Sequence, residues 1–183
     1  MRVGRILLFA SLMTVRLTTA ANAQEPSRVG ITMGYPASIG VLWHASERVA
    51  LRPELSFTLT DSSSESLIND ESNFWSLGTG VSVLFYSPLT DNLRTYVVPR
   101  FSYTRTSGDS TTTESTTDVY SFAGMFGAQY ALGRRFAAFG EVGANYSRQN
   151  GSVTTTIGAL TNRISNHGNT FGIRTAVGVI LYF

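Results

Sequence analysis

The strongest constraint on the fold comes from residues 169–183, which read NTFGIRTAVGVILYF. Every second side chain in this stretch is apolar or nearly so, as at Phe171, Thr175, Val179 and Phe183, and the intervening ones are mostly small or polar. Successive side chains of a β-strand point to opposite faces of its sheet. We therefore expect a long strand with one apolar face and one lean face of small and polar residues.

The same alternation recurs along the chain and predicts an all-β fold of eight strands. Most of the alternating stretches reach about 9–11 residues, enough to cross a bilayer as tilted strands. They lie near residues 29–35, 39–43, 49–59, 75–85, 95–103, 120–130, 136–146 and 171–183.

The alternation is unbroken from residue 29 to residue 45. Two interpretations fit it. One is a hairpin with a loop at residues 36–38, which sets Tyr35 opposite Ile39, and the other is a single long strand. We prefer the hairpin because it gives an even number of antiparallel strands, as closed barrels have.

The connections between the predicted strands alternate between short and long. Tight turns are expected near Ser46 and at residues 87–92 and 132–134. Long polar loops are expected at residues 61–73, 105–118 and 147–168, which are rich in Ser, Thr, Asn and Gly. Short turns at one end and long loops at the other are typical of membrane-spanning barrels.

Residues 1–23 have the features of a secretory signal peptide. Arg2 and Arg5 precede a short apolar run at residues 6–15, and Ala21 and Ala23 fit the small-x-small cleavage rule. The alternative is an uncleaved membrane anchor. Residues 24–183 would form the mature domain, and this part contains no run of 18 apolar residues that predicts a membrane helix.

Cysteine and charge content exclude several classes of function. Because the chain has no Cys, it has no disulfides, thiolate metal sites or Cys nucleophile. All fourteen basic residues are Arg, and loss of Arg2, Arg5 and Arg16 with the signal leaves eleven against twelve acidic residues. That balance gives no basic patch for nucleic acid. Only 14% of residues are charged, against roughly 25% in soluble domains, which favours a membrane barrel.

Aromatic residues gather at both ends of the predicted strands. Amphipathic rings favour the headgroup level of a bilayer, so we expect two interface belts, although aromatics also suit strands in general. The belt on the turn side comprises Trp43, Phe85, Tyr130, Phe136 and Phe183, and the belt on the loop side comprises Tyr35, Phe57, Trp75, Tyr103, Tyr120, Tyr146 and Phe171.

The lean face carries five charged residues that lie several positions into their strands: Arg52, Glu54, Arg100, Glu141 and Arg174. We predict that they form a charge network in the lumen near mid-height, because an unpaired buried ion is costly. A structural plug is favoured over a gate or ion path, since side chains fill the interior of eight strands.

Alternation alone does not say which face points outward. A soluble lipocalin-like barrel would line its pocket with the apolar face. The lean face is rich in Gly, Ser and Ala, as at Gly78, Ser82 and Ala123, which suits a narrow interior better than a soluble surface. We therefore expect the apolar face to contact lipid.

No catalytic, cofactor or metal site is predicted, and the chain is not expected to be an enzyme. Its two histidines, His44 on the lean face and His167 in the last long loop, cannot make a convincing transition-metal site. His167 also departs from the His-x-Ser-Asn arrangement of the lipid A deacylase family, since Gly168 and Asn169 follow it. The acidic loops lack the ligand spacing of a calcium loop.

The signal peptide, alternating strands, loop asymmetry and Phe183 together resemble the small eight-stranded bacterial outer-membrane β-barrels, the opacity-protein and OmpX- or OmpA-barrel kind. The resemblance implies a closed, antiparallel up-and-down transmembrane barrel. It also implies a monomer that lies among outer-membrane lipids and lipopolysaccharide, with a role in envelope integrity or adhesion through extracellular loops. In that family the assembly machinery reads a terminal aromatic and the alternate hydrophobes before it, here Phe183, Leu181 and Val179. A lipid A-modifying enzyme, a small-solute pore and a soluble lipocalin-like barrel remain the alternatives.

Overall fold

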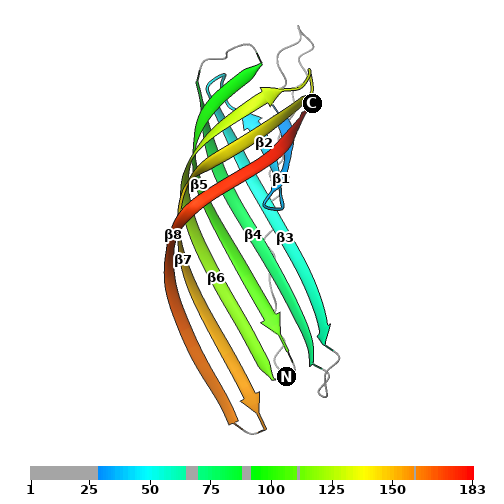
Figure 1. Cartoon of the computed structure of the whole chain (residues 1–183), viewed down its shortest axis with the longest axis vertical. Helices are drawn as coiled ribbons and strands as arrows, with labels where there is room; N and C mark the ends of the chain where they lie inside the picture. The colour runs from blue at the N-terminus through cyan, green and yellow to red at the C-terminus, as the bar shows by residue number, and fades with distance from the viewer. Residues whose placement is uncertain (1–28, 65–69, 88–91, 111, 159) are drawn as a thin grey trace.

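A computed structural model describes residues 29–64, 70–87, 92–110, 112–158 and 160–183, without the side chains of residues 61–64 and 70–72. The predicted signal peptide at residues 1–23 lies outside the described residues. Within the described part every regular element is a strand (Figure 1). The strands are β1 (Val29–Tyr35), β2 (Ser38–His44), β3 (Val49–Ser64), β4 (Asp70–Tyr86), β5 (Leu93–Asp109), β6 (Thr113–Ala131), β7 (Phe136–Ile157) and β8 (Leu160–Tyr182).

No helix among the described residues is long and apolar enough to cross a membrane.

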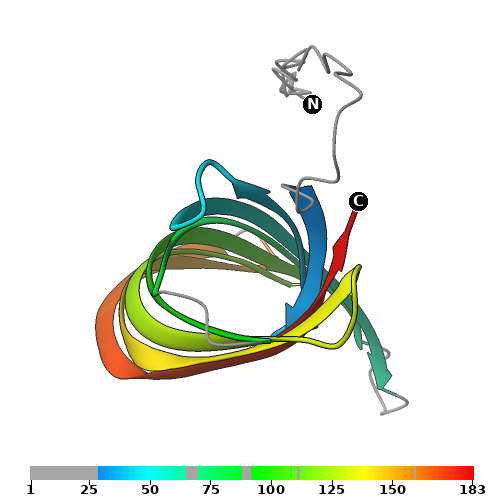
Figure 2. The same ribbon diagram turned by 90° about the horizontal axis from the view of Figure 1, so that it is seen from above.

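The strands form one antiparallel ring in chain order, and β1 closes it by pairing with β8 (Figure 2). The strand registers give the tilt of the strands relative to the barrel axis. Partners followed from Thr32 run through Gly40, Glu54, Gly80, Ser102, Ser121 and Ser147 to Thr170 on β8. The direct partner of Thr32 on β8 is instead Ile180, ten residues along. Ten residues rise about 34 Å, against about 38 Å for eight strand spacings, so the strands tilt by about 40°.

The preferred hairpin at residues 29–45 is confirmed, but its predicted register was wrong. Met33, not Tyr35, lies opposite Ile39, and Gly34 pairs with Ser38. The difference of two residues keeps every side chain on its predicted face, because side chains alternate with period two.

The long loops were predicted wrongly over most of their residues, because the strands continue through these stretches. β5 runs to Asp109 and β6 starts at Thr113, while β7 and β8 are separated only by residues 158–159. Residues 65–69, in the middle of the first predicted loop, lie outside the described residues. These polar stretches were missed because a hairpin solvated on both faces needs no alternation of hydrophobicity. Thr, which is abundant there, nevertheless favours strands.

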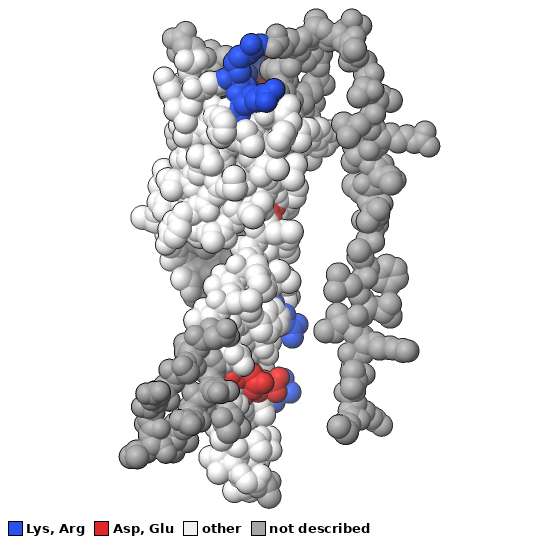
Figure 3. Space-filling model, turned by 90° about the vertical axis from the view of Figure 1, so that its right-hand side faces the viewer, with Lys and Arg blue, Asp and Glu red and all other residues white. Residues whose placement is uncertain are grey.

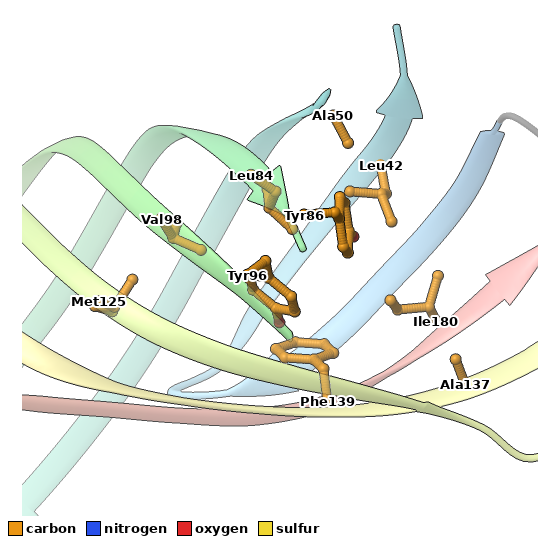
Figure 4. Close-up of a cluster of buried hydrophobic side chains, with 10 residues drawn as sticks. All are labelled: Leu42, Ala50, Leu84, Tyr86, Tyr96, Val98, Met125, Ala137, Phe139 and Ile180. Atoms are coloured by element: carbon orange, nitrogen blue, oxygen red, sulfur yellow. The ribbon is translucent and has the colours of Figure 1, made fainter. Parts of the chain in front are cut away.

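The eight strands differ greatly in length. The β1–β2 hairpin lies only at the end with the short turns, whereas the β7–β8 hairpin extends furthest from it (Figure 1). The short-turn end holds a core of inward-facing apolar side chains that fill the lumen (Figure 4). These are Leu42, Ala50, Leu84, Tyr86, Tyr96, Val98, Met125, Ala137, Phe139 and Ile180.

Candidate functional site

The outer wall of the ring carries a continuous apolar band. Phe136 and Tyr146 on β7 lie near its two edges, ten residues apart. Ten residues of strand rise about 34 Å, which a tilt of about 40° reduces to about 26 Å along the barrel axis. An apolar band about 25 Å tall is the dimension of membrane-spanning barrels.

Charged side chains are missing from this band at every described outward position between the two predicted belts. Large apolar side chains point out from it instead, such as Val97, Phe126 and Val142, each more than half exposed. Figure 3 shows one face, with charges clustered at the short-turn end and again far along the strands, and a wide, almost uncharged zone between them.

The aromatic side chains predicted for the belts all lie on the outer surface. Eleven of the twelve are at least 37% exposed: Tyr35, Trp43, Phe57, Trp75, Phe85, Tyr120, Tyr130, Phe136, Tyr146, Phe171 and Phe183. Tyr103 is half-buried; its ring lies 5.1 Å from that of Tyr120, and its hydroxyl donates to Asp118 Oδ1 at 2.6 Å.

Outward charges begin directly beyond the loop-side belt. Each of three belt tyrosines is followed, two residues closer to the loop-side end of its strand, by an outward charged residue. These residues are Arg105, Asp118 and Arg148. Arg105 and Asp118 are cross-strand partners with Nη1 and Oδ1 4.0 Å apart. This sequence of apolar band, tyrosine and then charge is the order found across a membrane interface.

The lumen contains the predicted charge network in large part. Arg52 is only 1% exposed and donates two hydrogen bonds to the Glu141 carboxylate, at 2.7 and 2.9 Å. Arg52 Nε also lies 3.6 Å from Glu54 Oε1, and Arg100 pairs with the other oxygen of Glu54. The hydroxyl of Tyr96 donates to Glu141 Oε1 at 3.0 Å. Four of the five predicted residues therefore form one connected group of two Arg and two Glu.

Glycines on neighbouring strands leave room for this group. A Cβ on Gly40 would come within 2.8 Å of Glu54 Cγ, and one on Gly127 would meet the ring of Tyr96, with Cζ at 2.6 Å. Because these distances are far below van der Waals contact, a larger residue at either position would displace a member of the network.

A second polar chain caps the lumen at the short-turn end. Tyr86 donates to Gln129 Oε1 at 3.0 Å, and Gln129 Nε2 donates to the Tyr182 hydroxyl at 2.8 Å. His44, predicted on the lean face near this rim, lies 3.4 Å from that hydroxyl and stacks on Tyr86. Sequence reasoning missed Tyr86, Tyr96 and Gln129. The available signal was that large residues occupy inward positions close to the turns.

Arg174 is the fifth predicted member, and the structure does not join it to the ion pairs. It faces inward and is half-buried, and its Nε has no hydrogen-bond partner among the described residues. Arg174 lies two residues from Gly172, which cross-strand pairing places in the same row as Arg100.

The remaining predicted positions lie on β8 or directly after it. His167 is exposed on the strand, paired with Asn150, and not in a loop as predicted. At the other end Val179 and Leu181 point outward, and the Phe183 amide donates to the carbonyl of Val29 at 3.1 Å.

These features define an eight-stranded antiparallel β-barrel with an apolar outer band and a filled lumen at one end. No protein-family model matches the chain, and no curated protein matches it. The fold is similar to that of a major outer membrane protein from Thermus thermophilus, with a TM-score of 0.57 and 11% sequence identity over 87% of this chain and 100% of that chain.

Two further crystal structures from Acinetobacter baumannii also match. CarO and CarO2 have TM-scores of 0.38 and 0.39 at 13% and 14% identity, over 87% and 88% of this chain and 100% of theirs. At 11% identity, the likeness to the Thermus protein shows a shared fold.

Proposed function

We propose that this chain is an integral barrel of the bacterial outer membrane. Its role would be structural or in surface interaction, through the hairpins that extend beyond the bilayer, and it would not be an enzyme. The observation that carries the proposal is the outer band, about 26 Å tall, in which no described outward position is charged.

A soluble barrel would not benefit from this surface, because large contiguous apolar patches on soluble proteins favour association. In a bilayer the same apolar side chains would contact apolar lipid chains. Where the strands pair around the ring, they also satisfy each other's backbone groups, as the bilayer core requires. The shared fold with an outer-membrane protein from Thermus thermophilus supports the same assignment.

We infer that the barrel lies among outer-membrane lipids and lipopolysaccharide. We also infer that the barrel assembly machinery inserts it and recognises Phe183, Leu181 and Val179. A monomer is the expected state, because the ring closes within one chain. Beyond the band, β7 and β8 form a long polar hairpin whose tip, Ile157 and Leu160, is 69% and 79% exposed. That tip is the surface best placed to meet a partner.

Lipid contact can be tested with single tryptophans and lipids brominated in their acyl chains. Both native tryptophans are replaced by Phe, and Trp is introduced at Val97, outward at mid-band, or at Thr154, outward and far beyond the band. We expect bromine to quench Val97→Trp strongly and Thr154→Trp little. Equal quenching at both positions, or none at either, would contradict the proposed membrane placement.

Two measurements separate the proposed role from other activities. Mass spectrometry of lipid A from cells with and without the protein would show a mass change if the barrel modified lipid A, and we expect none. Conductance in planar bilayers would show discrete steps for a solute pore, whereas the side chains that fill the short-turn end predict a silent bilayer.

A further inference from the structure

The wall of the ring is incomplete on the loop side. β8 pairs with β1 only through Val177–Tyr182, and β3 pairs with β2 only as far as Leu55. Above the tip of the β1–β2 hairpin, β8 and β3 therefore lack a described strand between them. The tip lies six residues above Val29, or about 16 Å at the tilt derived above, so the gap opens within the loop-side half of the apolar band.

The rims of this gap are apolar on the outside and polar on the inside. Phe171 and Ile173 on β8 are 75% and 85% exposed, and Phe57 on β3 is 59% exposed. Arg174 lies on the part of β8 that pairs with β7 but not with β1, and it faces inward, into the lumen behind the gap.

Unsatisfied polar atoms gather at the floor of that part of the lumen. One cross-strand row contains Ser82, Arg100, Ala123, Asn145 and Gly172, and Arg174 lies two residues from Gly172 on the same face. Six buried side-chain polar atoms among the described residues lack a partner, and four of them lie here: Ser82 Oγ, Arg100 Nε, Asn145 Oδ1 and Arg174 Nε. The Ser82 hydroxyl and the two guanidinium nitrogens can donate to an oxygen-rich group, whereas Asn145 Oδ1 is an acceptor and needs a donor.

The charge of the floor favours an anion. At this level of the lumen Arg52, Arg100 and Arg174 lie with Glu54 and Glu141, and both Glu are engaged by Arg52 and Arg100. Arg174 is left without an ion pair within the described chain, which leaves one positive charge uncompensated. A phosphate or carboxylate would accept from both guanidinium groups, and such charge-assisted hydrogen bonds are among the strongest in proteins.

From these observations we propose that the loop-side lumen binds an anionic amphiphile. Its acid group lies on Arg174 and Arg100, and its aliphatic tail leaves between β8 and β3 into the surrounding lipid. The inference rests on the proposed function, because only a lipid-embedded gap gives the tail an apolar destination.

The test uses the full chain in neutral maltoside micelles, with dodecyl phosphate as the probe and native mass spectrometry as the readout. We expect one dodecyl phosphate per chain, and at least tenfold weaker binding by Arg174→Gln. The matched control is Arg148→Gln, which removes an outward and exposed arginine from the adjacent strand and should bind as the wild type does. Equal binding by both variants, or no saturable binding by the wild type, overturns the proposal.

Two further arms separate the acid group from the tail. Dodecanol should not bind, and inorganic phosphate should bind at least tenfold more weakly than dodecyl phosphate; equal binding of the two phosphates would contradict the tail path. Gly172→Leu is expected to obstruct the site without disturbing the fold, since a Cβ there meets nothing within 4 Å. If Val97→Trp is quenched by brominated lipid but no probe binds, the membrane barrel stands and the amphiphile site fails.

Discussion

Replacement of Glu141 by Ala tests the charge network that fills the lumen. Glu141 is 4% exposed and receives two hydrogen bonds from Arg52 and one from Tyr96. Without it, the almost fully buried Arg52 retains only one ionic partner among the described residues, Glu54, with its Nε 3.6 Å from that carboxylate. Removal of one partner of a buried ion pair costs about 3–5 kcal/mol, so we expect the free energy of unfolding to fall by that amount.

The assay is reversible urea unfolding of the refolded barrel in detergent, followed by tryptophan fluorescence. The matched control is the double variant Arg52→Met with Glu141→Leu, which removes both charges and leaves the pair between Arg100 and Glu54 in place. Because apolar replacement of a whole buried pair is often close to neutral, the double variant should recover most of the loss. A loss below about 1 kcal/mol for Glu141→Ala, or a double variant less stable than the single one, would refute this reasoning.

Further predictions concern the outer face, the glycines and the lumen. Val142→Arg places a charge at mid-band and should lower the free energy of unfolding in lipid by about 2–4 kcal/mol. Thr154→Arg, beyond the band, should lower it by at most about 1 kcal/mol. Equal unfolding free energies for the two variants would contradict the band. Gly127→Val should cost about 1–3 kcal/mol by displacing Tyr96, and Gly140→Val, where a Cβ meets nothing within 4 Å, should be tolerated; the same unfolding assay decides between them. Planar bilayers should show no discrete conductance steps with the wild type, and stepwise currents would contradict a filled lumen.

The parts of the strands that form the apolar band were predictable, because their side chains alternate between an apolar outer face and a lean inner face. Outward Val97 and inward Val98 illustrate this, with 54% and 0% exposure. The Ser- and Thr-rich ends of β5 to β8 were not predicted, because both of their faces are polar and they show no hydrophobic period. Strand ends there depend on pairing with a neighbour, which a single stretch of sequence does not reveal.

The charge network was predictable as a set of residues but not as a set of pairs. Arg52 and Glu141 are 89 residues apart, and their meeting depends on the ten-residue offset accumulated around the ring. The isolation of Arg174 has the same origin, because β1 and β2 end below its level. Strand lengths and registers decide both outcomes, and neither follows from the types of residue on the lean face.

The central claim, a closed barrel in the outer membrane, is tested most directly by gel mobility after fractionation of the native envelope. A ring whose strands are hydrogen-bonded to one another should stay folded in SDS until it is heated. The account predicts that the protein is in the outer-membrane fraction and that its unheated form migrates differently from its boiled form. Recovery as a soluble periplasmic protein, with one mobility before and after heating, would contradict it.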